Sequence, residues 1–342
     1  MASSKYQPEL NVSLPEALDM APPQLREKIE ESIGIIKKAE LLALEYNPQK
    51  GFNVAFSGGK DSMALLWLFE HSGVKYHAEM QCTTIDPPEL MSFVREVYTK
   101  PGRVQLNLPP KYPDGKPMNF LSEVEKHGVP SRNARWCCST FKEFSGSGEV
   151  VATGLRIAES DRRKKQNPTP LKAFGGKKTF YGTIRHPKEV GPHSVVEKIG
   201  KRYVQHVDLF DIDAQTVLGC VRGAEKVMLS PIWNWTDHDV WNLIRTFKMP
   251  YCKLYDCGYQ RIGCILCPMS NVRMRSRDAK RYPTFVKKYT ERVQIFFDHC
   301  SDERKGAFKN AEHFMEWYIY SNKTISEFNN EQANPTLFND EK

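Results

Sequence analysis

One stretch near the start of the chain restricts the fold more than any other. It reads Phe52-Asn-Val-Ala-Phe-Ser-Gly-Gly-Lys-Asp-Ser-Met-Ala-Leu-Leu66 and predicts a buried strand at 52–56, a tight turn, and a helix that begins near Asp61. Gly58 and Gly59 allow a sharp turn and a close approach of the backbone to a ligand. The turn directs backbone N–H groups and the positive end of a helix dipole to one point, which suits a phosphate group.

The polar residues of this turn add to the same chemistry. Lys60 supplies a mobile positive charge, and Ser57 and Ser62 supply hydroxyl donors. Asp61 can cap the helix or bind Mg²⁺ together with phosphate oxygens. An ordinary corner between a strand and a helix would also use two glycines. The coincidence of all these features at one turn favours nucleotide binding.

The glycine spacing differs from that of a Walker loop. The segment Ser57-Gly-Gly-Lys-Asp-Ser62 instead resembles the pyrophosphate-binding loop (PP-loop) of the adenine-nucleotide alpha-hydrolase superfamily, the PP-loop ATP pyrophosphatases. The resemblance implies that ATP, with Mg²⁺, is cleaved between its alpha and beta phosphates and that AMP is passed to a substrate. It implies that Lys60 and the backbone of 58–61 hold the beta and gamma phosphates, with Asp61 near Mg²⁺.

Composition excludes several classes of protein. The 342 residues are 40% hydrophobic, and no apolar run is long enough to span a membrane. The first residues lack the apolar core of a signal peptide, so we expect a cytoplasmic protein without a membrane partner. Nine cysteines in such a chain favour a metal site or a reactive thiol over disulfides.

Strand-like and helix-like segments alternate along the chain. This alternation predicts an α/β fold with a doubly wound, mostly parallel sheet and a C-terminal helical extension. The expected strands are 52–56, 75–82, 104–108, 149–154 and 226–231; the expected helices are 24–46, 61–71, 88–99, 119–126, 237–247, 282–299 and 307–320. We expect three segments: a lead-in and helix at 1–48, a nucleotide-binding domain at 49–270 that also contains four paired cysteines, and a basic helical extension and tail at 271–342.

Some stretches do not follow this pattern. Residues 1–24 resemble a flexible lead-in, and the polar tail at 326–342 is expected to be weakly ordered. Residues 161–205 are rich in Lys, Arg, Gly and Pro, which predicts an inserted loop or a β-hairpin. Ligands of open α/β sheets bind beyond the carboxyl ends of strands, where Asp86, Gly154 and Arg156 fall. Asp86 is a candidate for the ribose or the metal, or a turn residue before two prolines.

Four cysteines form two pairs that suit a metal. Cys137 and Cys138 are adjacent, and Cys264 and Cys267 form a Cys-x-x-Cys turn. Four thiolates can hold zinc or a [4Fe–4S] cluster, and spacing does not decide between them. Buried inert cysteines or a redox dithiol are the plainer alternatives, and we assign the inert role to the cysteines outside this set, Cys82, Cys220, Cys252 and Cys300.

Four further motifs occur in the same order as in a known family. They are Arg135-Trp-Cys-Cys-Ser-Thr-Phe-Lys142, Thr153-Gly-Leu-Arg-Ile-Ala-Glu-Ser-Asp-Arg162, Ser230-Pro-Ile-Trp-Asn-Trp-Thr-Asp-His-Asp-Val-Trp241, and Gly258-Tyr-Gln-Arg-Ile-Gly-Cys-Ile-Leu-Cys267. Over about residues 50–270 they resemble the phosphoadenosine or adenosine phosphosulfate reductase family. The resemblance implies that Cys137, Cys138, Cys264 and Cys267 hold a [4Fe–4S] cluster, and that Gly154, Arg156 and Arg162 contact the nucleotide. Cys257 has no ligand role in the resemblance.

Two departures point away from a reductase. No cysteine follows Cys300, so the nucleophilic tail cysteine of the reductases is absent from this sequence, and Lys60 stands where those enzymes usually lack a lysine. Both features resemble the ATP-pyrophosphatase subunits of DNA phosphorothioation systems (DndC- and SspD-like). The resemblance implies that the enzyme adenylates a nucleic acid for sulfur incorporation, with Lys60, Asp61 and Arg156 as catalytic residues. A cysteine desulfurase would donate the sulfur, and other modification subunits are expected partners.

The alternative is a sulfonucleotide reductase that uses Cys257 or Cys300, and a third is a binding subunit without catalytic activity. The net charge is +8, and basic residues crowd 162–202 and 273–292. Together with Phe174, Phe180 and Tyr181, this pattern favours a nucleic-acid partner over a solvated charged face. The resemblance to the phosphorothioation subunits implies DNA rather than RNA. We also expect the glycine turn and the four cysteines to share a cavity.

Overall fold

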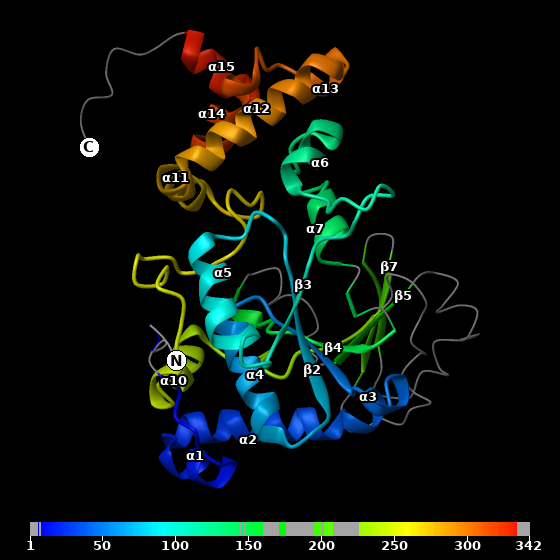
Figure 1. Ribbon diagram of the computed structural model, residues 1–342, viewed down its shortest axis with the longest axis vertical. Coiled ribbons are helices and arrows are strands. Elements are labelled where there is room, and N and C mark those ends of the chain that lie inside the picture. The colour runs from blue at the N-terminus through cyan, green and yellow to red at the C-terminus, as the bar shows by residue number, and fades with distance from the viewer. Residues whose placement is uncertain are drawn as a thin grey trace. The chain divides into compact units, whose positions relative to one another are not determined.

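The computed structural model describes residues 6, 8–143, 145–146, 148–159, 171–175, 195–199, 202–207 and 226–333. The chain forms two compact units (Figure 1). Unit 1 comprises Met1–Gln81, Pro88–Asn107 and Glu143–Ile262, and unit 2 comprises Cys82–Pro87, Leu108–Lys142 and Gly263–Lys342. The units are defined by packing. The three sequential segments expected above are a different division, and they stay a prediction.

Unit 1 is built on a sheet in which β1 (Phe52–Ala55) is the middle one of the parallel strands. Five parallel strands run in the order β3-β2-β1-β4-β8, and they comprise β1 with β2 (Tyr76–Gln81), β3 (Gln105–Asn107), β4 (Val150–Ala152) and β8 (Lys226–Leu229). Chain order runs outwards in both directions from the β1–β4 pair, so the strand order reverses there. The predicted fold class, an α/β fold with a mostly parallel sheet, is confirmed.

Three antiparallel strands extend this sheet beyond β8. They are β5 (Leu171–Gly175), β7 (Arg202–Val207) and β6 (Val195–Ile199), in that order from β8. The β-hairpin predicted within 161–205 is confirmed for β6 and β7. Apart from β5, the remaining residues of that segment lie outside the described residues.

Helices flank the sheet of unit 1. They include α2 (Pro23–Lys38), α3 (Glu40–Tyr46), α4 (Lys60–Ser72), α5 (Pro88–Val94) with a π-helical continuation at Arg95–Thr99, and α10 (Asp237–Thr246). Residues 63–69 of α4 are all fully buried, because α4 packs against both α2 and α10 (Figure 1). The single helix expected at 24–46 is wrong in one detail. It breaks at Ala39, and α3 then packs beside β1 and β4.

The lead-in at 1–24 is more ordered than expected. It contains α1 (Leu14–Met20), whose start is a capping box in which Glu16 accepts hydrogen bonds from the Ser13 N–H at 2.8 Å and from its hydroxyl at 2.7 Å. The Leu10 N–H donates to the Phe247 carbonyl at 3.1 Å, which fixes the segment further. The expectation of a flexible lead-in is therefore wrong for these described residues.

Unit 2 is helical and has a core of its own. Its helices are α6 (Phe120–His127), α7 (Trp136–Phe141), α11 (Val272–Arg281), α12 (Pro283–His299), α13 (Asp302–Lys305), α14 (Ala311–Tyr320) and α15 (Ile325–Ala333). Helix α12 packs against α6 and α14, and Tyr289 meets Phe120 edge to face at 5.3 Å. The predicted C-terminal helices are confirmed. The tail expected to be weakly ordered from residue 326 is helical as far as Ala333, so that expectation is wrong for α15.

Candidate functional site

The turn after β1 has the geometry that its sequence predicts. Gly58 has φ +71°, and a Cβ atom there would lie 2.6 Å from Val94 and 2.8 Å from Leu90 of α5, so only glycine fits. The Ser62 hydroxyl accepts the Ser57 N–H at 3.1 Å and donates to the Gly59 carbonyl at 2.9 Å. Ser57 itself is exposed, whereas Gly58 and Ser62 are buried. Ser62 therefore shapes the turn from within, while Ser57 stays accessible to a ligand.

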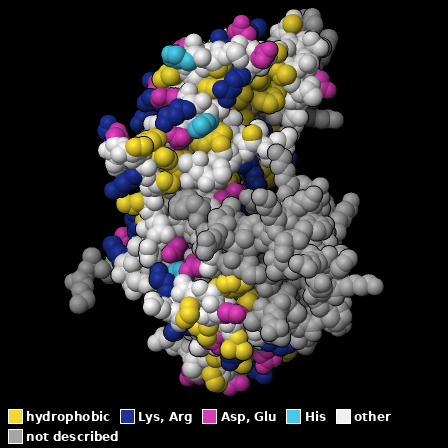
Figure 2. All heavy atoms as spheres, turned by 90° about the vertical axis from the view of Figure 1, so that its right-hand side faces the viewer, with side chains coloured by type: hydrophobic (Ala, Val, Ile, Leu, Met, Phe, Trp, Pro, Cys, Tyr) yellow, Lys and Arg dark blue, Asp and Glu magenta, His cyan; other side chains and the backbone are white. Residues whose placement is uncertain are grey.

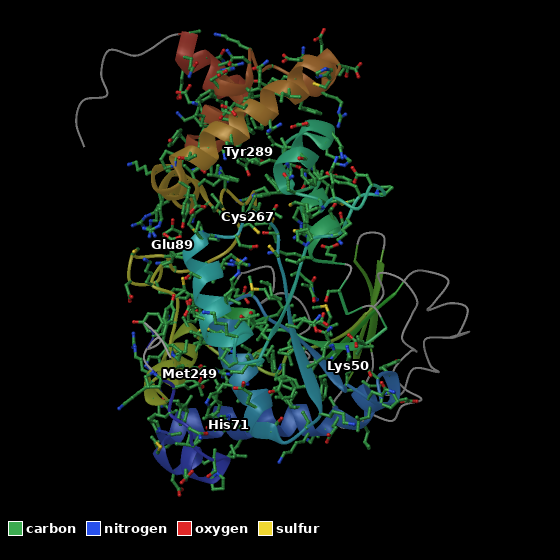
Figure 3. The ribbon with its side chains drawn as sticks, in the orientation of Figure 1. Lys50, His71, Glu89, Met249, Cys267 and Tyr289 are labelled. Atoms are coloured by element: carbon green, nitrogen blue, oxygen red, sulfur yellow. The ribbon has the colours of Figure 1, made fainter. Side chains whose placement is uncertain are left out.

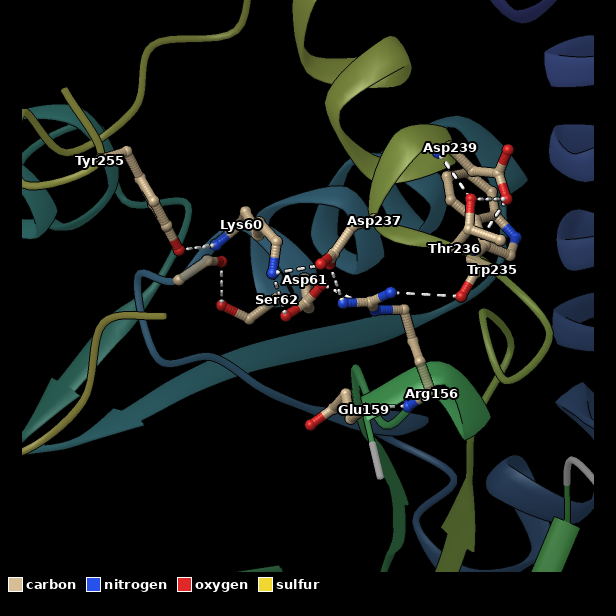
Figure 4. A network of polar contacts seen from close by, with 11 residues as sticks. Lys60, Asp61, Ser62, Arg156, Glu159, Trp235, Thr236, Asp237, Asp239 and Tyr255 are labelled. Carbon is tan, nitrogen blue, oxygen red and sulfur yellow. Dashed lines mark hydrogen bonds and ion pairs between the residues drawn. The ribbon is translucent and has the colours of Figure 1, made fainter. Parts of the chain in front are cut away.

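Four charged side chains meet beside this turn (Figure 4). Lys60 Nζ lies 3.2 Å from Asp61 Oδ2 and 3.2 Å from Asp237 Oδ1. Arg156 lies 2.8 Å from Asp61 Oδ1 through Nε and 2.6 Å from Asp237 Oδ1 through Nη2. We call these four residues the charge quartet. It joins the start of α4, the segment after β4 and the start of α10, and it includes all three predicted catalytic residues.

The two cations of the quartet are almost fully buried. The side chain of Lys60 is 5% exposed and that of Arg156 is 2% exposed, while Asp237 is mostly exposed. Arg156 Nη1 also donates to the Trp235 carbonyl at 3.2 Å, and its backbone N–H donates to Glu159 at 2.9 Å. Burial acts to raise the pKa of Asp237, but the charges of Lys60 and Arg156 outweigh it, so the pKa lies below the ordinary 3.8.

Glycine at 154 allows the quartet to assemble. A Cβ atom at Gly154 would lie 3.0 Å from the carbonyl carbon of Asp61, so the segment after β4 approaches the start of α4 closely. The Thr153 N–H donates to the Leu229 carbonyl and the Ile157 N–H to the Trp233 carbonyl, both at 2.8 Å. These bonds hold Arg156 at the carboxyl ends of β1 and β4. Open α/β sheets bind ligands at such a reversal of strand order.

Two residues of this site were missed by the sequence prediction. Asp237 was expected only as the first residue of the helix 237–247, although it follows β8 at the same edge of the sheet. Tyr255 accepts the Lys60 N–H through its hydroxyl at 2.8 Å, and burial raises the pKa of this phenol. Asp237 was detectable from the position of strand 226–231. For Tyr255 no local pattern gives a signal, since almost two hundred residues separate it from Lys60.

Two other predicted nucleotide contacts are placed less directly. Asp86 belongs to unit 2 and accepts the Thr83 N–H at 2.7 Å, as expected for the turn interpretation. Its assignment to the ribose or the metal stays a prediction. Arg162 lies outside the described residues.

The four predicted cluster cysteines all belong to unit 2 and are all partly exposed. They lie near enough to interact. The pKa of the Cys137 thiol is raised by its hydrogen bond with Cys138, by burial and by the charges of Cys138, Cys264 and Cys267. Cys264 Sγ also lies 3.5 Å from the Thr83 hydroxyl. The glycine turn belongs to unit 1, so a cavity shared with these cysteines stays a prediction.

A lysine accompanies the cysteines, and sequence reasoning missed it too. Lys142 is exposed as a residue, yet its ammonium group lies beside the thiol of Cys264, which is the main reason why the pKa of Lys142 is raised. Four soft thiolate donors with one cation nearby suit an iron–sulfur cluster or zinc. Within the described residues, no group of three or more His, Cys, Asp or Glu side chains is spaced to hold a single metal ion. A multi-iron cluster, in which each thiolate binds a different iron, is compatible with wider spacing.

The basic segments are only partly described, because the side chains of 162–202 lie outside the described residues. Two arginines of the segment 273–292 make contacts within unit 2: Arg275 is buried and donates to the Ser270 carbonyl at 2.7 Å, and Arg292 pairs with Glu125. On the face seen in Figure 2, the Lys and Arg side chains of the described residues lie among Asp and Glu rather than in one basic area. A nucleic-acid partner stays a prediction.

None of the helices in the described part of the chain is both long and apolar enough to cross a membrane.

Two proteins of Methanocaldococcus jannaschii, both uncharacterised, are similar to this chain over most of its length. One is 26% identical over 278 residues, which are 79% of this chain and 54% of the relative. The other is 23% identical over 251 residues, which are 70% of this chain and 41% of the relative. The chain therefore spans about half the length of these relatives.

Shorter similarities reach named enzymes. Adenosine 5'-phosphosulfate reductase 2 of Bacillus subtilis is 36% identical over 58 residues, 17% of this chain and 25% of that protein. Among solved structures, the phosphoadenylyl-sulfate reductase of Candida auris, as a phosphate complex, has a TM-score of 0.39 at 15% identity, over 75% of this chain and 98% of that chain.

A family model also matches more than half of the sequence. The model of the phosphoadenosine phosphosulfate reductase domain matches residues 51–270, which include β1, the glycine turn, the charge quartet and all four paired cysteines. The predicted resemblance to this family is confirmed, while the narrower resemblance to DNA phosphorothioation subunits stays a prediction. Since the match covers more than half of the sequence, the chain belongs to the phosphoadenosine phosphosulfate reductase domain family.

Proposed function

We propose that unit 1 binds ATP at the turn after β1 and cleaves it between the alpha and beta phosphates. An oxygen of a nucleic-acid phosphate attacks the alpha phosphorus, and pyrophosphate leaves. A sulfur nucleophile then attacks the nucleic-acid phosphorus that bears the adenylated oxygen, so that a P–S bond forms and AMP leaves with that oxygen. The observation that carries this proposal is the buried charge quartet beside a glycine turn at the reversal of strand order. The best match to this chemistry is DNA phosphorothioate modification.

Each residue of the quartet has a role in this reaction. Lys60 and the N–H groups of the turn would bind the beta and gamma phosphates, in competition with Asp61 and Asp237 for the ammonium group. Arg156 is oriented by three acceptors, so it is ready to stabilise charge that develops on the transferred nucleotide. Asp61 and Asp237 would hold Mg²⁺, which typically binds one or two carboxylates together with phosphate oxygens.

Unit 2 would supply the sulfur chemistry. Cys137, Cys138, Cys264 and Cys267 would hold a [4Fe–4S] cluster, whose chemistry when bound would be to accept or position sulfur. Lys142 would offset the negative charge of the thiolates. The expected partners are DNA, a cysteine desulfurase as sulfur donor, and other subunits of a modification system.

The test is release of pyrophosphate and AMP from ATP by anaerobically purified protein, supplied with DNA and a sulfur donor. Lys60→Ala should lower turnover by at least a hundredfold, because the charge that binds the phosphates is lost. Lys50→Ala is the matched control: Lys50 is exposed just before β1, at the opposite end of that strand (Figure 3). Its turnover should equal that of the wild type.

Two results would contradict the proposal. The first is full activity in the Lys60→Ala variant, which would favour a binding subunit whose partner performs the chemistry. The second is the absence of pyrophosphate release from protein shown by analysis to contain iron and acid-labile sulfide. Protein that contains zinc instead would refute the cluster and leave the ATP chemistry to be judged by turnover.

A sulfonucleotide reductase is the second candidate, favoured by the exposed thiol of Cys257 and by the reductases among the shorter similarities. Cys300 is a weaker candidate, because its thiol is partly buried and points to the Phe297 carbonyl at 3.8 Å. Release of sulfite from adenosine or phosphoadenosine phosphosulfate, with thioredoxin as reductant, would establish this activity. Loss of that release in Cys257→Ser, with Cys300→Ser unaffected, would assign the thiol.

A further inference from the structure

Unit 1 contains a cavity of about 890 Å³ that shares no residue with the charge quartet. It lies between the start of α5 and the turn after α10, and its lining includes Glu89, Arg245, Lys248, Met249, Tyr251 and Lys253. Figure 3 labels two of these, Glu89 and Met249. The volume falls in the range of roughly 300–1,000 Å³ that is typical of small-molecule sites.

The lining combines apolar surface with positive charge. Ile244, Met249 and Pro250 are buried and form an apolar wall, next to the ring of Tyr251. Arg245, Lys248 and Lys253 are exposed, and within the described part of the chain none of them has a carboxylate partner. Of the two acids in the lining, Asp256 accepts a hydrogen bond from the Tyr251 hydroxyl at 3.0 Å. The cavity therefore favours a ligand with a planar apolar part and a negative charge.

The backbone at Lys248 is strained. Helix α10 ends in a Schellman motif, in which the Met249 N–H donates to the Ile244 carbonyl at 2.8 Å and the Lys248 N–H donates to the Arg245 carbonyl at 3.2 Å. The motif puts Lys248 in the left-handed region at φ +51°. Glycine is the usual residue at this position, because any side chain there costs energy.

The fold alone does not explain this lysine. A cation is favourable near a helix C-terminus, but Arg245 already supplies one in the last turn of α10 without strain. What Lys248 adds is an exposed ammonium group at the cavity, which has no carboxylate partner among the described residues. Local strain of this kind is common where a side chain serves a ligand.

We propose that this cavity is a second ligand site, for a nucleoside monophosphate or a similar phosphorylated compound with a planar ring. The ring packs against Tyr251 and the apolar wall, and Lys248 binds the phosphate together with Arg245 and Lys253. This site does not depend on ATP cleavage at the turn after β1.

The aromatic residues beside the cavity lead to that turn. Trp241 meets Tyr251 at 5.4 Å and Tyr255 at 5.0 Å between ring centroids, both edge to face. Tyr255 is the residue whose hydroxyl accepts the Lys60 N–H. A ligand packed on Tyr251 would therefore be connected to the glycine turn through the contacting rings of Trp241 and Tyr255.

The test is calorimetric titration of AMP and UMP into the Lys60→Ala protein, which lacks the charge proposed to bind the beta and gamma phosphates of ATP. Comparison with the same protein carrying Lys248→Gly separates binding at the cavity from binding of AMP at the turn after β1. We expect saturable binding at the cavity. Adding Lys248→Gly should weaken binding about tenfold, because a charge-assisted hydrogen bond to phosphate is lost, while the melting temperature rises because the strain is relieved. Lys248→Arg keeps the charge and should keep the affinity.

Three outcomes would overturn the proposal. They are no saturable binding of either nucleotide to the Lys60→Ala protein, equal affinity with and without Lys248→Gly, and a melting temperature that falls in Lys248→Gly. The last would show that the lysine serves the fold rather than a ligand. Because every titration uses the Lys60→Ala background, these results are independent of the proposed ATP chemistry.

Discussion

At the scale of single residues, Gly58 makes the sharpest prediction. Its φ of +71° and the 2.6 Å and 2.8 Å that a Cβ atom would leave to Val94 and Leu90 exclude any side chain. Gly58→Ala should therefore lower the free energy of unfolding by about 2 kcal/mol or more, from backbone strain and overpacking. Urea denaturation followed by circular dichroism measures the change.

Gly34 provides the matched control, because it lies within α2 and a Cβ atom there would meet nothing within 4 Å. Gly34→Ala should raise the free energy of unfolding by up to about 1 kcal/mol, since alanine is the better helix former. Equal changes in the free energy of unfolding for the two substitutions would show that the backbone conformation and close contacts of Gly58 do not require glycine there.

The charge quartet predicts a pH dependence. The pKa of Asp237 is below its ordinary 3.8 in the folded protein, so its pairing stabilises the fold fully above that value. This contribution is lost as the pH falls through the lower folded pKa. The difference in unfolding free energy between wild type and Asp237→Asn should therefore be constant from pH 7 to about pH 5 and shrink below pH 4. A difference that grows on acidification would contradict this assignment.

The quartet also marks how far sequence reasoning reaches at this scale. Lys60, Asp61 and Arg156 were identified because each follows a strand that its own apolar run predicts. Asp237 also follows such a strand, but it was expected only as the first residue of a helix, so its contacts with Lys60 and Arg156 were not predicted. The contact of Tyr255 with Lys60 depends on tertiary packing, so neither periodicity nor spacing in the sequence predicts it.

At the scale of elements, periodic apolar runs were predicted well, and two short helices near the ends of the chain were not. The strands 52–56 and 226–231 appear as β1 and β8, because a buried parallel strand is an almost continuous apolar run. Helices α1 and α15 were missed although both start with a capping box, at Ser13 and Thr324. With seven and nine residues, these helices are too short for a helical period of apolar residues to identify them.

The capping box of α15 can be tested directly. Thr324→Ala removes the hydroxyl that donates to Glu327 at 2.8 Å and should destabilise the helix by about 1 kcal/mol. Amide hydrogen exchange of 325–333 should become several-fold faster, because the local opening free energy falls. Ser301→Ala is the control, since Ser301 makes no side-chain cap bond to α13. No change in exchange in Thr324→Ala would refute the cap.

At the scale of the whole molecule, the alternation of strands and helices was enough to predict the parallel sheet. The grouping of the chain into units was not predicted, because it depends on contacts between distant segments. Two segments, 82–87 and 108–142, lie in the sequence between parts of unit 1 but pack with Gly263–Lys342 in unit 2. Nothing in the composition of these pieces distinguishes them from ordinary connections between strands.

This interleaving has a consequence for any shortened form of the protein. The chain passes from one unit to the other five times, after residues 81, 87, 107, 142 and 262, so no single cut separates them. A stop codon after residue 262 would keep unit 1 complete but leave Phe120, Val124 and Phe141 without Tyr289 and Val293. Such a product would expose apolar surface to chaperones and proteases. A nonsense allele there would therefore behave as a null through degradation even if the parallel sheet of unit 1 had folded.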